Sequence, residues 1–417
     1  MSAITLRHSH TSDSQLLKEI NETRLLTLVS RHGPLSRASI AKQAHMAKAT
    51  VSEIISRLLE AGLVEEIGKG DSTSRGGKRP TLIQLRASGR FLFGIDIKRE
   101  QTHLQLTNLL GEEIEFEALH YALGTPMDAV LERTMTAMER MLQTHEIAPQ
   151  LLLAIGISIP GLVDYRRGEL WMADTLPGWD HHPVNKRFEE RFSVPCMVEN
   201  DVNCTTWGER LNGVGVGSQG DQICIFLGDG IGAGIVHDQH IVRGNAGGAG
   251  EIGYIEVHCP ALPKDGYLFN GQRFYGELLG IASLIRACIK AGVAEEGESL
   301  ETILRKNRSG LETVLNEYAL ALASLTQNLV KTLNPESVII AGKPVEFSPY
   351  LVEKVREYVD LGLKASALHI EVELRIGTLG TRAALAGAVA MAKQTLFKPV
   401  IAQHFTPAMS FEGTVAV

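Results

Sequence analysis

Long apolar runs are missing from this chain of 417 residues. A helix that spans a membrane needs about 20 consecutive apolar residues, and no segment approaches that length. Residues 1–15 are polar and hold no apolar stretch after a basic start, so we expect no secretory signal and interpret them as a frayed tail. These absences predict a cytoplasmic protein that makes no contact with a membrane.

Cysteine is also scarce. The five cysteines are odd in number, scattered, and never form a Cys-x-x-Cys pair. Disulfide frameworks and cysteine-rich metal sites need closely paired cysteines, so the pattern favours reduced thiols in a cytoplasmic compartment.

Basic residues are in deficit overall but not at the N-terminus. The formal net charge is −7, yet residues 1–90 hold 14 Lys and Arg against 8 Asp and Glu, a balance of +6. The remaining 27 basic and 40 acidic residues give −13. A basic head on an acidic body predicts that only the head contacts a polyanion.

The head has the pattern of three short helices. Residues 16–32 carry apolar side chains at a helical period, and Gly33-Pro34 ends that helix. Ser36 is a suitable N-cap for a second helix over 37–45. A third helix is expected over 48–60, with Gly62 just beyond its end.

Two β-like runs, 64–67 and 81–85, follow the helices and enclose a polar loop over 68–79. Three helices and a hairpin make a winged helix-turn-helix, in which the third helix reads DNA bases and the loop contacts phosphates or a narrow minor groove. The predicted DNA-binding residues are Lys48, Thr50, Ser52, Glu53, Arg57, Lys69, Arg75, Lys78 and Arg79.

From Phe91 onward, strands alternate with helices in an order that occurs twice. A β-β-β-α-β-α unit starts at residue 91 and restarts at residue 222. Two long helices are expected over 300–333, and a last helix over 381–396 is expected to pack on the first lobe. This repeat predicts a two-lobed actin-like ATPase fold of the ribonuclease H-like type, whose lobes close over a ligand.

Three polar segments are expected at the cleft between these lobes. Glu199-Asn200-Asp201 lies where a strand opens into a helix, and could bind sugar hydroxyls or simply cap the helix. Leu227–Gly234 is a glycine-rich hairpin, although Asp229 places a carboxylate where a phosphate would sit. Glu251 follows in the glycine-rich loop 247–254 and could bind two hydroxyls of a pyranose.

Together these segments resemble the ROK family (repressors, open reading frames and sugar kinases). The resemblance runs from about residue 16 to 395 and is closest to the repressor branch, which includes N-acetylglucosamine and glucose-responsive repressors. Its signature comprises Ile155–Asp164, Leu176–Trp179, Glu199–Asp201 and the glycine-rich stretch to Gly253.

The resemblance implies a sugar effector held between the lobes. It places sugar contacts on Asn200, Asp201 and Glu251, with Gly161 beside them and Glu277 as a looser match. Thr175 stands where the family has Asn, which would alter the hydroxyl that is recognised.

Three departures from the family pattern argue against catalysis. The kinase string Asp-x-Gly-Gly-Thr is replaced by Asp96–Glu100, in which Lys98 and Arg99 block close backbone approach to phosphates. Asp229 replaces the Thr or Ser of the second phosphate loop. Tyr254 replaces a zinc-binding His and Cys259 is the only cysteine of its region, so we expect no zinc, no other cofactor and no catalytic residue.

These observations predict a transcriptional regulator, most simply a repressor relieved by a sugar or sugar phosphate. We expect a homodimer or homotetramer that binds a palindromic operator. Two alternatives stay open. One is an active sugar kinase with a DNA-binding head, supported by Asp201 and opposed by Lys98, Arg99 and Asp229. The other is a regulator controlled by docking to a sugar-transport protein.

The expected domains are a DNA-binding head over 1–88, a first lobe over 89–205 that is completed by helix 381–396, and a second lobe over 206–380 that carries the oligomerisation surface.

Overall fold

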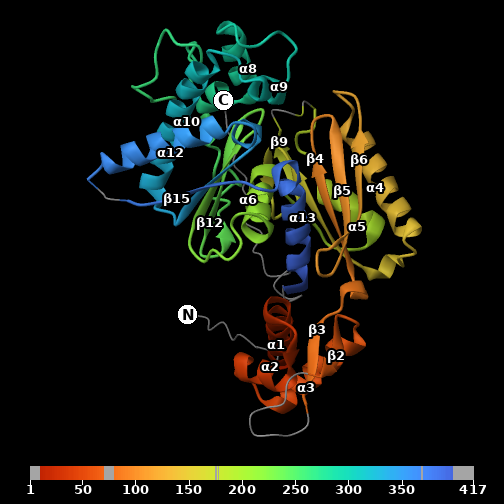
Figure 1. The fold of residues 1–417 in the computed structure, drawn as a ribbon. Coiled ribbons are helices and arrows are strands. Elements are labelled where there is room, and N and C mark those ends of the chain that lie inside the picture. The colour runs from red at the N-terminus through yellow and green to blue at the C-terminus, as the bar shows by residue number, and fades with distance from the viewer. Residues whose placement is uncertain (1–9, 70–78, 174–175, 177, 368–369, 398–417) are drawn as a thin grey trace, which may run out of the picture.

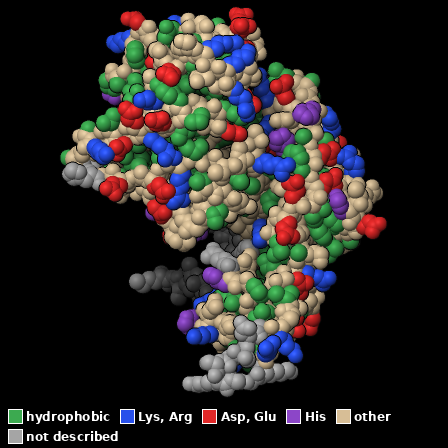
Figure 2. All heavy atoms as spheres, viewed as in Figure 1, with side chains coloured by type: hydrophobic (Ala, Val, Ile, Leu, Met, Phe, Trp, Pro, Cys, Tyr) green, Lys and Arg blue, Asp and Glu red, His purple; other side chains and the backbone are tan. Residues whose placement is uncertain are grey.

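The computed structural model describes residues 10–69, 79–173, 176, 178–367 and 370–397. A small head lies at one end of the molecule, and two lobes stand side by side above it (Figure 1). On the face shown in Figure 2, acidic side chains are spread over the lobes, and Lys and Arg side chains lie at the far end of the head.

The head is a helix-turn-helix with a small sheet. Its core is formed by apolar side chains of all three helices and of the hairpin, among them the fully buried Leu25, Ile40, Val51 and Ile83. The sheet has the order β1-β3-β2. The elements are α1 (His10–His32), β1 (Leu35–Ser36), α2 (Arg37–Ala44), α3 (Lys48–Glu60), β2 (Val64–Lys69) and β3 (Thr81–Leu85).

Local sequence explains the turn of this motif. The Ser36 hydroxyl accepts the Ser39 N–H at 3.1 Å and caps α2, as predicted. His45 ends α2 in the left-handed conformation, with φ of 52°. Helix α3 has the predicted bounds. Helix α1 begins at His10, so the expectation of a frayed tail is wrong from that residue on.

The first lobe is a five-stranded sheet of order β10-β7-β4-β5-β6. Strands β4, β5 and β6 are antiparallel neighbours, and β7 and β10 extend the sheet in parallel. Its elements are β4 (Phe91–Ile97), β5 (Gln101–Asn108), β6 (Glu113–His120), α4 (Met127–Thr144), β7 (Leu152–Ile159), the hairpin β8 (Leu162–Asp164) and β9 (Glu169–Met172), α5 (Val184–Phe192), β10 (Cys196–Asn200) and α6 (Asp201–Asn212).

The second lobe repeats this plan with the order β13-β12-β11-β14-β15. The pairing again changes from antiparallel to parallel at the first strand of the unit. Its elements are β11 (Gln222–Leu227), β12 (Ile231–His237), β13 (His240–Ile241), α7 (Tyr275–Leu279), α8 (Ile281–Lys290), α9 (Leu300–Lys306), α10 (Leu311–Leu333), β14 (Ser337–Ala341), α11 (Lys343–Glu346), α12 (Pro349–Lys364) and β15 (Glu373–Ile376).

Several boundaries differ from the predictions. The expected pair of long helices over 300–333 is wrong, because Asn307 and Gly310 adopt positive φ and leave the short α9 before the long α10. The expected strand 239–243 is reduced to β13, and β15 was not predicted. The expected boundary at 205/206 falls inside α6, which continues unbroken to Asn212.

The C-terminal helix α13 (Ala383–Gln394) stands between the lobes and packs on β4, β7 and α6 (Figure 1). Glycines permit this close approach. A Cβ added at Gly208 on α6 would overlap the Ala383 carbonyl oxygen, and one added at Gly387 on α13 would overlap that of Cys204. A single methyl group at either position would therefore separate the two helices.

The substitution Gly387→Ala should lower the free energy of unfolding by about 2 kcal/mol or more, because the new methyl group meets backbone. On an exposed helix the same change would stabilise by about 0.5–1 kcal/mol, so the sign is diagnostic. The matched control is Gly362→Ala in α12, where the added Cβ would meet only the end of the Gln327 side chain. Chemical denaturation checks both variants, and an unchanged or raised stability for Gly387→Ala would contradict the packing argument.

Candidate functional site

The outward face of α3 is the candidate DNA-reading surface. Lys48 and Glu53 are exposed, whereas Thr50 and Ser52 are half-buried beside the apolar face. Arg57 is less free than the sequence predicted. Its guanidinium lies 3.1 Å from Glu53 and 3.6 Å from Glu22 of α1, so it braces α3 against α1. Lys48 is therefore the cleaner probe of DNA contact.

The predicted wing is only partly described. Lys69 is exposed at the end of β2, and Arg79 is exposed just before β3. Arg75 and Lys78 lie outside the described residues, so their roles stay predictions.

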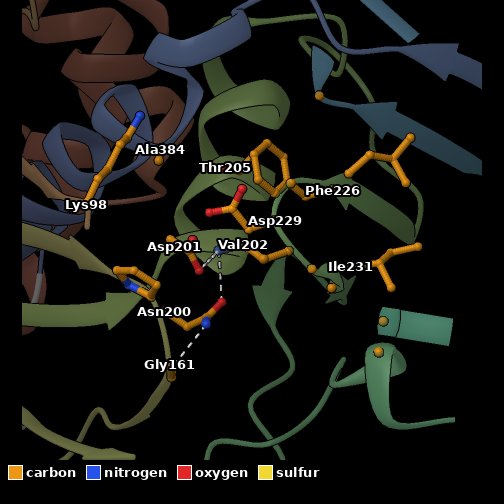
Figure 3. A pocket seen from close by; sticks show the side chains of 18 of the residues that line it. Lys98, Gly161, Asn200, Asp201, Val202, Thr205, Phe226, Asp229, Ile231 and Ala384 are labelled. Atoms are coloured by element: carbon orange, nitrogen blue, oxygen red, sulfur yellow. Dashed lines mark hydrogen bonds between the residues drawn. The ribbon is translucent and has the colours of Figure 1, made fainter. Parts of the chain in front are cut away.

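The cleft between the lobes has a volume of about 1140 Å³. It is lined by the β4–β5 turn, the start of α6, the β11–β12 hairpin and the loop that precedes α7. In Figure 3, the Asp229 carboxylate reaches into this cavity from the β11–β12 hairpin. The predicted effector residues that line the cleft are Gly161, Asn200, Asp201, Glu251 and Glu277, while Thr175 lies outside the described residues.

Asn200 is committed largely to the fold. Its side-chain oxygen accepts the N–H groups of Val202 at 2.9 Å and Asn203 at 3.1 Å, which caps α6. Its amide nitrogen donates to the Gly161 carbonyl at 3.0 Å (Figure 3). Asn200 therefore ties the turn after β7 to the start of α6, and has one amide hydrogen left for a ligand.

Asp201 has an unusual carboxyl group. Burial at the foot of the cleft, together with the charges of Asp96 and Glu251, raises the pKa of Asp201 to about 7. Near neutral pH the group can therefore accept a hydrogen bond or donate one. A sugar hydroxyl can answer either form, and a general base would also need such a pKa.

Glu277 has a structural role. Its carboxylate accepts the N–H of Arg273 at 3.0 Å and that of Phe274 at 3.4 Å, closing the turn before α7. The looser of the predicted sugar contacts thus stabilises the cleft wall.

The first phosphate loop is occupied by an ion pair. The Lys98 ammonium lies 3.0 Å from the buried Asp96 carboxylate, which also accepts the Ser158 hydroxyl at 2.9 Å. The Lys98 N–H donates to the Gln101 carbonyl and closes the β4–β5 turn. The side chain and the amide that would have to receive phosphate thus already have partners.

The second phosphate loop is similarly self-contained. The Gly228 N–H donates to the Gly230 carbonyl at 2.9 Å, inside the β11–β12 hairpin. The Asp229 side chain between them is exposed to the cleft. A nucleotide phosphate would meet a carboxylate here in place of a free amide.

The segment after Tyr254 is held by packing and hydrogen bonds. Tyr275 is fully buried, and Glu317 of α10 accepts the Leu268 N–H at 2.8 Å. Tyr267 is exposed, so its predicted part in this packing is wrong. Within the described ranges, no three His, Cys, Asp or Glu side chains are placed to hold a metal ion. The expected lack of zinc stays a prediction for elemental analysis.

One pair of residues near the site was missed by the sequence reasoning. Glu199 is buried and lies 2.5 Å from Arg243, which is distant in sequence and belongs to the other lobe. The only signal in the sequence was the position of Glu199 at the end of an apolar strand, where a carboxylate needs a partner.

A helix-turn-helix head joined to a two-lobed, sugar-kinase-like body defines a class of sugar-linked regulators. The ROK family model matches residues 92–395, and the MarR family model matches residues 18–67. The chain belongs to the ROK family and carries a MarR-type DNA-binding region.

Named relatives cover nearly the whole chain. A xylose repressor of Caldicellulosiruptor bescii is 29% identical over 388 residues, covering 90% of this chain and 96% of the relative. The DNA-binding transcriptional dual regulator NagC of Escherichia coli K12 is 26% identical, with 93% and 96% covered.

Solved structures share the fold. A ROK family transcriptional regulator, a homolog of E. coli MLC, matches with a TM-score of 0.75 at 23% identity, covering 92% of this chain and 97% of that one. A ROK family glucokinase from Streptomyces griseus, in complex with glucose and AMPPNP, matches with a TM-score of 0.60 at 23% identity, with 73% and 99% covered. No helix in the described part of the chain is long and apolar enough to cross a membrane.

The raised pKa of Asp201 predicts a pH-dependent stability. The folded protein binds a proton at Asp201 up to about pH 7, whereas an unfolded aspartate releases it near pH 4. Ionising Asp201 therefore opposes folding, and this cost grows as the pH rises from about 4 through 7. Asp201→Asn should be more stable than the wild type at pH 8, and the difference should shrink at pH 5.

Urea denaturation at the two pH values measures this difference. Asp164→Asn is the control, because this carboxylate lies in the β8–β9 turn, where it accepts backbone N–H groups. A stability difference for Asp201→Asn that is the same at both pH values would contradict the raised pKa.

Proposed function

We propose that this protein is a sugar-responsive transcriptional repressor of genes for carbohydrate uptake or catabolism, and that it acts in the cytoplasm. The observation that carries the proposal is the union, in one chain, of an intact reading helix and a cleft whose two phosphate loops are filled by the protein itself. The relatives named as repressors, which cover most of the chain, support it.

The head would bind operator DNA through α3 in the major groove. Lys48 and Glu53 offer exposed polar groups to base edges, and Lys69 and Arg79 lie at the hairpin that would contact phosphates. A single head reads only one half-site. We therefore propose a homodimer or homotetramer that presents two heads to a palindromic operator.

The cleft would take an uncharged sugar. Among the described residues that line it, seven are acidic and three are basic, a formal balance of −4. One of the three basic groups, Lys98, is already paired with Asp96. A phosphorylated ligand would have to enter against this charge, whereas sugar hydroxyls match carboxylates and the Asn200 amide. D-Xylose is the first candidate, because several relatives are named xylose repressors.

We propose that the protein is not an enzyme. The Asp201 carboxyl would suit a kinase base, and the glucokinase shares the fold. A kinase also needs donors around the transferred phosphate, and here Lys98 and the Gly228 amide are already engaged.

Helix α13 would couple the two sites. At its start, Thr381 and Ala384 line the cleft. Beyond its end, Leu396 packs against the apolar core of the head together with Leu109 and Leu153. A rearrangement of the lobes by sugar would therefore reach the heads and change their spacing. Such coupling is reciprocal and is typically worth about 1–3 kcal/mol.

The DNA-binding proposal predicts that Lys48→Ala weakens binding to DNA fragments that the wild type selects from a random library. Loss of one phosphate contact also lowers the salt slope of binding by about 1. Replacing Arg75 and Arg79 together should lower it further. The matched control is Lys364→Ala on α12, which should change neither quantity.

Fluorescence anisotropy at several salt concentrations measures both quantities. Wild-type affinity in both head variants would sink the assignment. Arg57→Ala is less informative, because the change leaves Glu22 and Glu53 of the α1–α3 contact without their shared partner.

The ligand proposal predicts that an unphosphorylated sugar such as D-xylose raises the melting temperature, while ATP with Mg²⁺ does not. Asp201→Ala should cost about 2–3 kcal/mol of sugar affinity, because other polar groups would remain buried and unpaired. Operator binding without sugar should persist.

Calorimetry and differential scanning fluorimetry measure these effects. Phosphoryl transfer to a sugar that is lost in Asp201→Asn would establish the kinase alternative. If no sugar binds, control by docking to a sugar-transport protein becomes the leading proposal, and a pull-down from membranes would test it.

A further inference from the structure

A salt bridge joins the two lobes beside the effector site. Glu199 belongs to β10 of the first sheet, and Arg243 follows β13 at the edge of the second sheet. The Arg243 Nε donates to Glu199 Oε2 at 2.5 Å. The carboxylate is almost fully buried, so this contact offsets the cost of holding its charge away from water.

The remaining oxygen of Glu199 acts on the first wall of the site. Oε1 accepts the Asn200 N–H at 3.1 Å and the Asn203 side-chain amide at 3.0 Å. Asn200 and Asp201 follow directly in the chain. The position of Glu199 therefore fixes the start of α6, from which both proposed sugar contacts of the first lobe project.

The backbone of Arg243 acts on the opposite wall. Its carbonyl accepts the Ala249 N–H at 3.2 Å, which folds residues 243–249 into a closed loop. Glu251 lies two residues beyond that loop and lines the cleft. The loop is also seated on the first lobe, because a Cβ added at Gly247 would meet the Val163 carbonyl of β8 at 2.5 Å.

The Arg243 guanidinium is held in place by an aromatic ring. It lies 4.7 Å from the ring centre of Tyr165, in the turn between β8 and β9. Arg166 approaches the same ring at 5.6 Å, but from the same turn. Stacking on Tyr165 orients the planar guanidinium toward Glu199, which a flexible ammonium would match only in part.

We infer that Arg243 is the positioning residue that assembles the effector site across the two lobes. Its side chain sets Asn200 and Asp201 through Glu199, and its backbone sets the loop that carries Glu251. The inference rests on the proposed sugar site for its consequence in binding, but the structural link itself can be measured without any sugar.

The first experiment is hydrogen exchange by mass spectrometry on the full chain without ligand. Arg243→Gln should speed exchange by about fivefold or more in peptides 243–251 and 196–203, which belong to different lobes. A merely local role would affect the first peptide alone. Wild-type exchange in peptide 196–203 would overturn the inference, whether or not the protein binds sugar.

The second experiment is calorimetric titration with D-xylose, with D-glucose and N-acetyl-D-glucosamine in parallel. Arg243→Gln should weaken the sugar that binds the wild type by about tenfold or more, since the walls of the site lose their common support. Arg243→Lys should restore part of the affinity, because it keeps the charge but loses the planar stack. Unchanged affinity in Arg243→Gln would overturn the inference.

The matched control is Arg166→Gln, which removes the other cation from the Tyr165 ring and should leave both readouts unchanged. If Arg243→Gln does not fold, the double variant Glu199→Gln, Arg243→Gln leaves no buried carboxylate unpaired and takes its place in both experiments. If the wild type binds none of the three sugars, the proposed sugar response fails, while the exchange result still decides the role of Arg243.

Discussion

The close packing of α13 against α6 and the first sheet is the contact on which the rest of this structure depends. Both helices belong to the region where the lobes meet, and Gly208 and Gly387 bring their backbones into contact. Two backbones at this distance leave no layer of side chains to absorb a shift. Motion of either helix must therefore move the other, because close-packed interiors transmit displacement instead of damping it.

Charge within the cleft is arranged around this helical floor. Asp96, Asp201 and Glu199 are carboxyl groups held close to α6, and each is managed differently. Asp96 is paired with Lys98, Glu199 is paired with Arg243, and the pKa of Asp201 is raised so that it exchanges a proton near neutrality. Two of the three carboxylates thus have a permanent cation, and Asp201 stays available for a ligand.

Sequence predicted the parts of the fold that local physics determines. Helix α3 was placed to the residue because an apolar stripe and a following glycine define it, and the doubled strand pattern showed the two lobes. The long-helix pair failed because the break at Asn307–Gly310 was hidden between two apolar patterns. Strand β15 was missed because its four residues are half-exposed and rely on pairing with β14.

The site shows the same division. Asn200, Asp201 and Glu251 could be identified because each follows a recognisable motif. The capping roles of Asn200 and Glu277 depend on backbone geometry, which the sequence shows only as an ambiguity between binding and capping. The partnership of Glu199 with Arg243 joins residues 44 positions apart on different lobes, and nothing local in either segment identifies the other.

A cleft that closes on a sugar without consuming it has a thermodynamic advantage for regulation. A kinase converts its substrate, so the occupancy of its site depends on turnover as well as on concentration. When Lys98 fills the phosphate loop, binding becomes a reversible equilibrium, and the coupling between sugar and operator is the same in both directions. The loss of the phosphate site thus turns closure of the two lobes from a step in catalysis into a measure of sugar concentration.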